Sequence, residues 1–197
     1  MKRRILVAIL TVLTLVSTMA IPALADTTAG VTVTAAPSFV GIAIAQSTWT
    51  INGIDGSGKL AINTTYYSNA TGANGDVTAP SATVVDGECY FTMTNTSTVA
   101  TNITLNMPHF VGGDAMQNIN TGYANNGANS FGASTYISGA SWPSAAVIAQ
   151  NSSSAAMKSG LTAGTSLLFG IAIKTQSGAW ASGTAMTSAV LVTAVAV

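Results

Sequence analysis

Apolar and polar residues alternate along most of this chain, and helical periodicity is nearly absent. The alternation is clearest over residues 89–107. A period of two residues is typical of strands that bury one face against a core. We therefore expect two half-buried antiparallel strands, residues 89–94 and 102–107, joined by the short polar loop 95–98. Their buried faces are expected to carry Cys89, Phe91, Met93, Ile103, Leu105 and Met107.

Further short segments show strand character, and glycine, asparagine and proline separate them. The other expected strands are residues 31–34, 39–44, 48–51, 131–137, 144–149, 155–161, 165–174 and 190–197. Residues 112–130 are rich in Gly, Asn, Ala and Ser, so we expect a long surface loop with a short strand or turn near 116–119. About nine to eleven short strands without helices favour an all-β fold, a single antiparallel β-sandwich that is immunoglobulin-like or jelly-roll-like.

The first residues follow a different pattern. A basic start, Lys2-Arg3-Arg4, precedes an apolar run over residues 5–21 and the small-residue triplet Ala23-Leu24-Ala25. This order is typical of a secretory signal peptide. We expect cleavage after residue 25, which leaves residues 26–197 as one domain that is secreted or associated with the cell surface. The apolar run is shorter than the roughly 20 residues of a comfortable membrane span, so we expect no membrane attachment after cleavage.

Residues 26–197 carry very few charges. They contain three lysines and six acidic residues, so the formal charge is 3 − 6 = −3. A chain without a basic patch cannot release counterions from a phosphate backbone, so nucleic acid is not an expected partner. A surface with so little charge repulsion favours association between copies.

The sequence also contains few side chains that could catalyse a reaction or bind a metal ion. His109 is the single histidine, whereas a catalytic histidine needs an orienting carboxylate and zinc needs several nitrogen or sulfur ligands. Cys89 is the single cysteine, so it cannot form an internal disulfide, and we expect it to be a small buried hydrophobe. We therefore expect no enzyme activity, no cofactor and no metal centre. Asp55-Gly56 and Asp86-Gly87-Glu88 contain oxygen ligands that suit calcium, but turn chemistry also explains them, and calcium binding stays open.

Aromatic side chains in loops give an alternative function. Trp142 lies beside Pro143, and Trp180 lies in a segment of small residues. Together with Tyr123, these side chains could form a platform on which sugar rings stack, as in a carbohydrate-binding module. Capping the end of a core is an equally economical role for both tryptophans. Trp49, which lies within an expected strand, is interpreted as a core residue.

Two other features leave alternatives open. Asn-x-Ser/Thr sequons begin at Asn63, Asn69, Asn95, Asn102 and Asn151, and a chain so rich in Asn, Ser and Thr produces some of these by composition alone. The expected strand at residues 31–34 follows closely on the cleavage site. It either pairs within its own domain, which we favour because neighbouring strands usually pair, or is donated to the sheet of another copy.

The segment Phe91-Thr92-Met93-Thr94-Asn95-Thr96-Ser97-Thr98, followed by Val99 to Thr104, resembles the strand–turn–strand of prokaryotic exported sandwich domains. These include immunoglobulin-like surface modules and, more loosely, WxL-type and camelysin/TasA-type envelope and matrix proteins. Residues 167–174 and 186–197 resemble the closing hairpin of such domains. The Trp-x-Leu motif is missing here, and the resemblance assigns no functional residue.

Charge, leader and resemblance lead to one functional hypothesis. We expect a non-catalytic exported protein with a structural or interaction role at the cell surface or in an extracellular matrix. Copies of itself or other envelope components are its expected partners. A glycan is the expected ligand under the alternative carbohydrate-binding hypothesis.

Overall fold

The structure is a computed structural model that describes residues 29–35, 41–51, 60–72, 76–118, 127–143, 154–180 and 185–197. Strands dominate these residues, as the alternating pattern predicts. The strands are β1 (Ala29–Ala35), β2 (Ile42–Ile44), β3 (Thr48–Ile51), β4 (Thr65–Tyr67), β5 (Phe91–Asn95), β6 (Thr101–Asn106), β7 (Gln117–Asn118), β8 (Ser130–Ile137), β9 (Ala155–Leu161), β10 (Ser166–Lys174) and β11 (Met186–Ala196), and a short 3-10 helix, η1, spans Asp86–Glu88.

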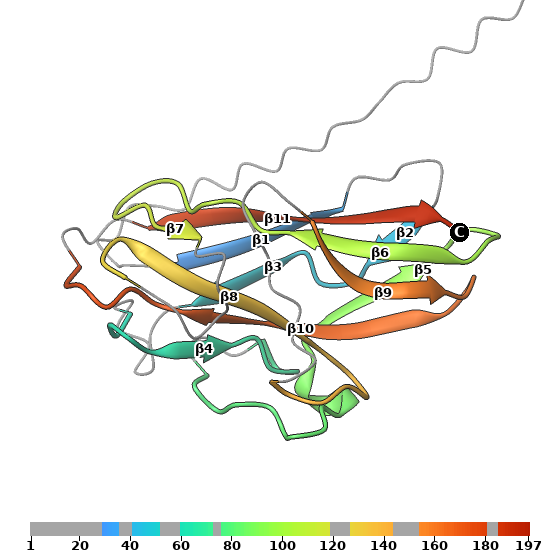
Figure 1. The fold of residues 1–197 in the computed structure, drawn as a ribbon, viewed down its shortest axis with the longest axis horizontal. Coiled ribbons are helices and arrows are strands. Elements are labelled where there is room, and N and C mark those ends of the chain that lie inside the picture. The colour runs from blue at the N-terminus through green and yellow to red at the C-terminus, as the bar shows by residue number, and fades with distance from the viewer. Residues whose placement is uncertain are drawn as a thin grey trace, which may run out of the picture.

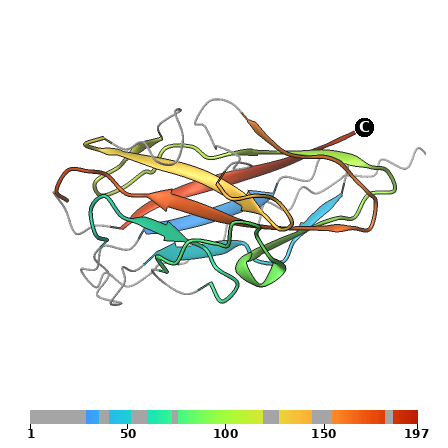
Figure 2. The same cartoon turned by 60° about the horizontal axis from the view of Figure 1, so that its bottom comes forward.

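These strands form the predicted β-sandwich of two sheets (Figure 1). Sheet A has the order β3-β1-β11-β6-β9, and sheet B has the order β2-β5-β10-β8-β7, with β4 also paired to β10. In Figure 2, β8 and β10 of sheet B pass in front of β1 and β11 of sheet A. Most neighbours are antiparallel, but β1 runs parallel to β11 and β7 runs parallel to β8. The fold class is therefore as predicted.

The prediction of a hairpin over residues 89–107 is wrong. Both strands exist, but β5 pairs with β2 and β10 in sheet B, whereas β6 pairs with β11 and β9 in sheet A. The link between them is an arch from one sheet to the other. Asn95 fastens this arch, because its buried side-chain amide donates to the carbonyls of Val99 (2.9 Å) and Leu161 (2.8 Å). Period two shows only that alternate residues are buried, and that is equally true of strands that face each other across a core.

The closing hairpin suggested by the resemblance is absent for the same reason. β10 belongs to sheet B and β11 to sheet A, so these two strands also face each other across the core. β11 begins at Met186, four residues before the expected strand. The predicted short strand near residues 116–119 is confirmed as β7, while the expected strand at 144–149 lies outside the described residues.

The main core lies between the two sheets and contains the predicted inward residues of β5 and β6. Phe91 and Phe169 stack there with ring centroids 5.2 Å apart, and Trp49 is buried as predicted. Cys89 precedes β5 instead of lying in it, and it packs in a second cluster. This smaller cluster, which we name the Tyr136 cluster, consists of Tyr67, Val84, Cys89, Tyr136, Trp142 and Ala172.

Candidate functional site

The aromatic residues proposed for sugar stacking occupy separate places. Trp142 is only 8% exposed and packs in the Tyr136 cluster, with its ring centroid 5.4 Å from that of Tyr136 and 6.1 Å from that of Tyr67. Trp180 is half-buried against the main core, and its indole Nε1 donates to the carbonyl of Leu60 at 2.5 Å. Tyr123 lies outside the described residues. The structure therefore does not bring Trp142 and Trp180 together on one surface.

The candidates for acid–base and thiol chemistry are embedded in structure. Cys89 is buried, and this burial raises the pKa of its thiol to about 12, with smaller contributions from the nearby carboxylates of Asp86 and Glu88. A thiol with such a pKa is not a nucleophile at neutral pH. His109 is half-buried in the segment that follows β6, between the core residues Met107 and Phe110.

The carboxylates near η1 have structural partners. Glu88 accepts hydrogen bonds from the backbone N–H of Ser81 (2.9 Å) and Val85 (3.0 Å), and from the Ser81 hydroxyl. The Asp86 carboxylate accepts from the Ser138 hydroxyl. In the part of the chain that the structure describes, no three His, Cys, Asp or Glu side chains gather as a metal site would require. Asp55, the other calcium candidate, lies outside that part.

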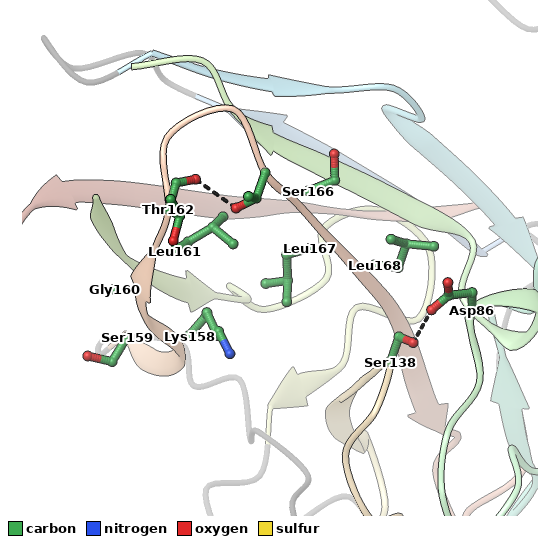
Figure 3. A pocket seen from close by; sticks show the side chains of 11 residues that line it. Asp86, Ser138, Lys158, Ser159, Gly160, Leu161, Thr162, Ser166, Leu167 and Leu168 are labelled. Carbon is green, nitrogen blue, oxygen red and sulfur yellow. Dashed lines mark hydrogen bonds between the residues drawn. The ribbon is translucent and has the colours of Figure 1, made fainter. Parts of the chain in front are cut away.

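A polar groove opens between β9 and β10, near the turn that joins them (Figure 3). Its volume is about 540 Å³. β8 ends at Ile137, opposite Phe169, so residues 166–168 of β10 have a described strand neighbour on one side only. The groove is lined by Asp86, Ser138, Lys158, Ser159, Gly160, Leu161, Thr162, Thr165, Ser166, Leu167 and Leu168. These hydroxyl groups give the groove hydrogen-bonding capacity, but the lining contains no histidine, cysteine or aromatic side chain.

Lys158 is the one cation among the residues that line this groove. Figure 3 shows Lys158 and Thr162 on one side of this space and the hydrogen-bonded pair of Asp86 and Ser138 on the other. Sequence analysis did not single out Lys158. The signal that could have found it is the scarcity of positive charge, since Lys158 is one of only three basic residues beyond residue 25.

The outer face of sheet A is the second surface of interest. Alternate residues of β11 point away from the core, and we name this set the β11 outer row: Thr187, Ala189, Leu191, Thr193 and Val195. Leu191 is 39% exposed and Val195 is 57% exposed, although both lie in β11, the central strand of sheet A, and not in a loop. Their partners on β6 are Asn106 and Asn102, so no charge lies directly beside them.

The apolar character continues beyond the end of β11. Val197 is 77% exposed, and its backbone N–H donates to the carbonyl of Ala100 at 3.0 Å. Val99, the residue before Ala100 in the chain, is 45% exposed. Sequence analysis predicted the strand at residues 190–197 but did not identify its outward residues. The signal that could have done so is the spacing of two that Leu191 and Val195 share with the polar residues Thr187 and Thr193.

Comparison of the chain with family models, with curated proteins and with solved structures found no match. Within the described ranges, the structure contains no helix of the length and apolar character that a membrane crossing requires.

Proposed function

We propose that this chain is an exported, non-catalytic structural protein of the cell surface or extracellular matrix, and that it associates with copies of itself through the outer face of sheet A. The observation that carries the proposal is the β11 outer row. Large apolar side chains stand exposed in the middle of a sheet, where polar residues usually face water. Only hydroxyl, amide and methyl groups surround them on β6 and β11.

The energetics support contact between faces. Complete burial of a leucine or valine side chain contributes about 1.5–3 kcal/mol, and Leu191 and Val195 still have part of their surface to bury. Residues 26–197 have a formal charge of only −3, so repulsion between copies is small. The threonine and asparagine side chains around the apolar residues cost less free energy to remove from water than charged side chains would.

Strand addition at the β9 edge of sheet A is disfavoured by comparison. β9 carries Lys158, and its pairing with β6 shifts register twice between residues 101 and 104. Gly160 also has a positive φ of 60°. A charge and an irregular backbone are common means by which proteins prevent pairing at an edge strand. We therefore place the self-association on the face of the sheet and not on this edge.

The test is the mass of residues 26–197 in solution, measured by sedimentation over a wide concentration range. We expect association, and we expect the double variant Leu191→Lys, Val195→Lys to weaken it about tenfold or more, which corresponds to roughly 1.4 kcal/mol. The matched control is Val85→Lys, at a valine that is 54% exposed but lies next to η1. A chain that stays monomeric, or a control that dissociates the oligomer equally, would contradict the proposal.

Export has a separate test. The full chain should be produced in a bacterium that carries a general secretion system, and the exported fraction should be analysed by N-terminal sequencing. Cleavage is expected to give a chain that begins at Asp26. An intact chain that is retained in the cytoplasm would contradict the exported location.

A further inference from the structure

The structure separates the five sequons by what each asparagine does. An N-linked glycan replaces one hydrogen on the side-chain Nδ2, so an acceptor needs an exposed and unengaged amide. Asn95 fails this requirement, because it is fully buried and its Nδ2 donates to the carbonyls of Val99 and Leu161. Asn69 is half-buried, and its Nδ2 donates to the carboxylate of Asp76. Asn151 lies outside the described residues.

Asn102 has an unsuitable backbone environment. Its sequon, residues 102–104, lies within β6, which is paired with β11 on one side and with β9 on the other. The central residue, Ile103, is fully buried. The Oδ1 of Asn102 also accepts from the Ser159 hydroxyl and from the Gly160 N–H. A transferase needs access to the backbone of the sequon, and a strand that is paired on both sides, as β6 is, does not offer that access.

Asn63 meets the requirement. It is exposed and occupies a turn with φ of 51°, and its side chain makes no hydrogen bond to any residue that the structure describes. The turn is fixed by its backbone, since the N–H of Asn63 donates to the carbonyl of Gln176 at 2.8 Å. The third residue of the sequon, Thr65, is at the start of β4, a three-residue strand whose described strand partner is β10 alone.

We propose that Asn63 is an N-glycosylation site, and this inference rests on the exported location proposed above. The donor would be an oligosaccharide linked to a lipid through phosphate. The Asn63 Nδ2–C1 bond forms as the bond from sugar C1 to the phosphate oxygen breaks, the lipid phosphate leaves, and one amide proton is released. Because β4 belongs to sheet B, the glycan lies on the opposite layer from the β11 outer row and leaves that row free for association.

The test expresses the full chain in a eukaryotic secretory host that glycosylates Asn-x-Ser/Thr sequons. One arm keeps residues 1–25, and a second arm replaces them with a leader that is proven in that host. The secreted protein is analysed by intact mass and by peptide mapping before and after treatment with a peptide N-glycosidase. We expect a glycan on Asn63 and none on Asn95.

Variants separate the sequon from its surroundings. Asn63→Gln and Thr65→Val should abolish this modification, whereas Thr65→Ser should retain it and Asn102→Gln should leave it unchanged. A chain secreted in the second arm with Asn63 unmodified would overturn the proposal, as would a glycan on Asn95. If only the arm with its own leader fails to be secreted, that failure counts against export by residues 1–25 and not against Asn63.

Discussion

At the scale of single residues, Gly170 has no room for a side chain. It lies in β10 opposite Tyr136 of β8, and the Tyr136 ring covers it so closely that a Cβ would overlap the ring atoms. Tyr136 has little freedom to move, since its hydroxyl donates to the carbonyl of Ser68 at 2.9 Å and its ring packs on Trp142.

We therefore expect Gly170→Ala to lower the free energy of unfolding by about 1–3 kcal/mol, the usual cost of overpacking a core. Chemical denaturation followed by tryptophan fluorescence measures the change. The control is Gly87→Ala, because an added Cβ there has no atom within 4 Å. Equal stability of the Gly170 variant and the control would show that the Tyr136 cluster can rearrange.

Cys89 gives a prediction about pH. Burial raises the pKa of its thiol from the ordinary value of 9.0 to about 12, so the folded state favours the protonated form. The resulting stabilisation is complete below pH 9 and is lost as the pH rises from 9 to 12. At pH 8 we expect the native thiol to resist a disulfide reagent and the unfolded chain to react at once. The free energy of unfolding should also decrease less steeply between pH 9 and 12 in Cys89→Ala than in the unchanged chain.

At the scale of elements, β1 is not joined by a tight turn to either of the strands with which it pairs. It pairs with β11 at seven positions in parallel and with β3 at four positions in the antiparallel sense, and it does not pair with β2, the next strand along the chain. In this structure the strand at residues 31–34 therefore pairs within its own chain.

Deletion of residues 26–35 tests what β1 contributes. It removes the strand between β3 and β11 and leaves two rows of backbone groups without their partners, each at a cost of about 1–3 kcal/mol where buried. We expect loss of cooperative unfolding, as measured by near-ultraviolet circular dichroism. A folded monomer that no longer associates would instead support donation of this strand between copies.

At the scale of the whole molecule, the scarcity of charge sets how association should respond to salt. Contacts between charged surfaces weaken as salt is added, because the Debye length falls from about 10 Å at 0.1 M to about 3 Å at 1 M. The β11 outer row is uncharged, so we expect the dissociation constant to change by less than about threefold over that range. Sedimentation at both salt concentrations measures it, and a large increase in the dissociation constant at 1 M would point to an interface elsewhere, for example around Lys158.

The sequence by itself determined the strand content and the buried face of most strands. Alternation is a local property, and it correctly assigned Phe91, Met93, Ile103 and Leu105 to the core because a strand turns successive side chains to opposite sides. The same reasoning gave Trp49 as a buried residue, whereas Cys89 is buried before β5 and in the Tyr136 cluster. None of it depends on which strand lies next to which.

Only the tertiary structure decided which sheet each strand joins. β5 and β6 carry the pattern of a hairpin, yet they lie in different sheets because Asn95 fastens an arch between them, and a buried amide of this kind leaves no periodic signal. The parallel pairing of β1 with β11 joins residues more than 150 positions apart, which local patterns cannot specify. The exposure of the Leu191 and Val195 side chains, and of the Asn63 side chain, follows from that arrangement. Exposure depends on what packs against a residue, and the packing is set by contacts between distant parts of the chain.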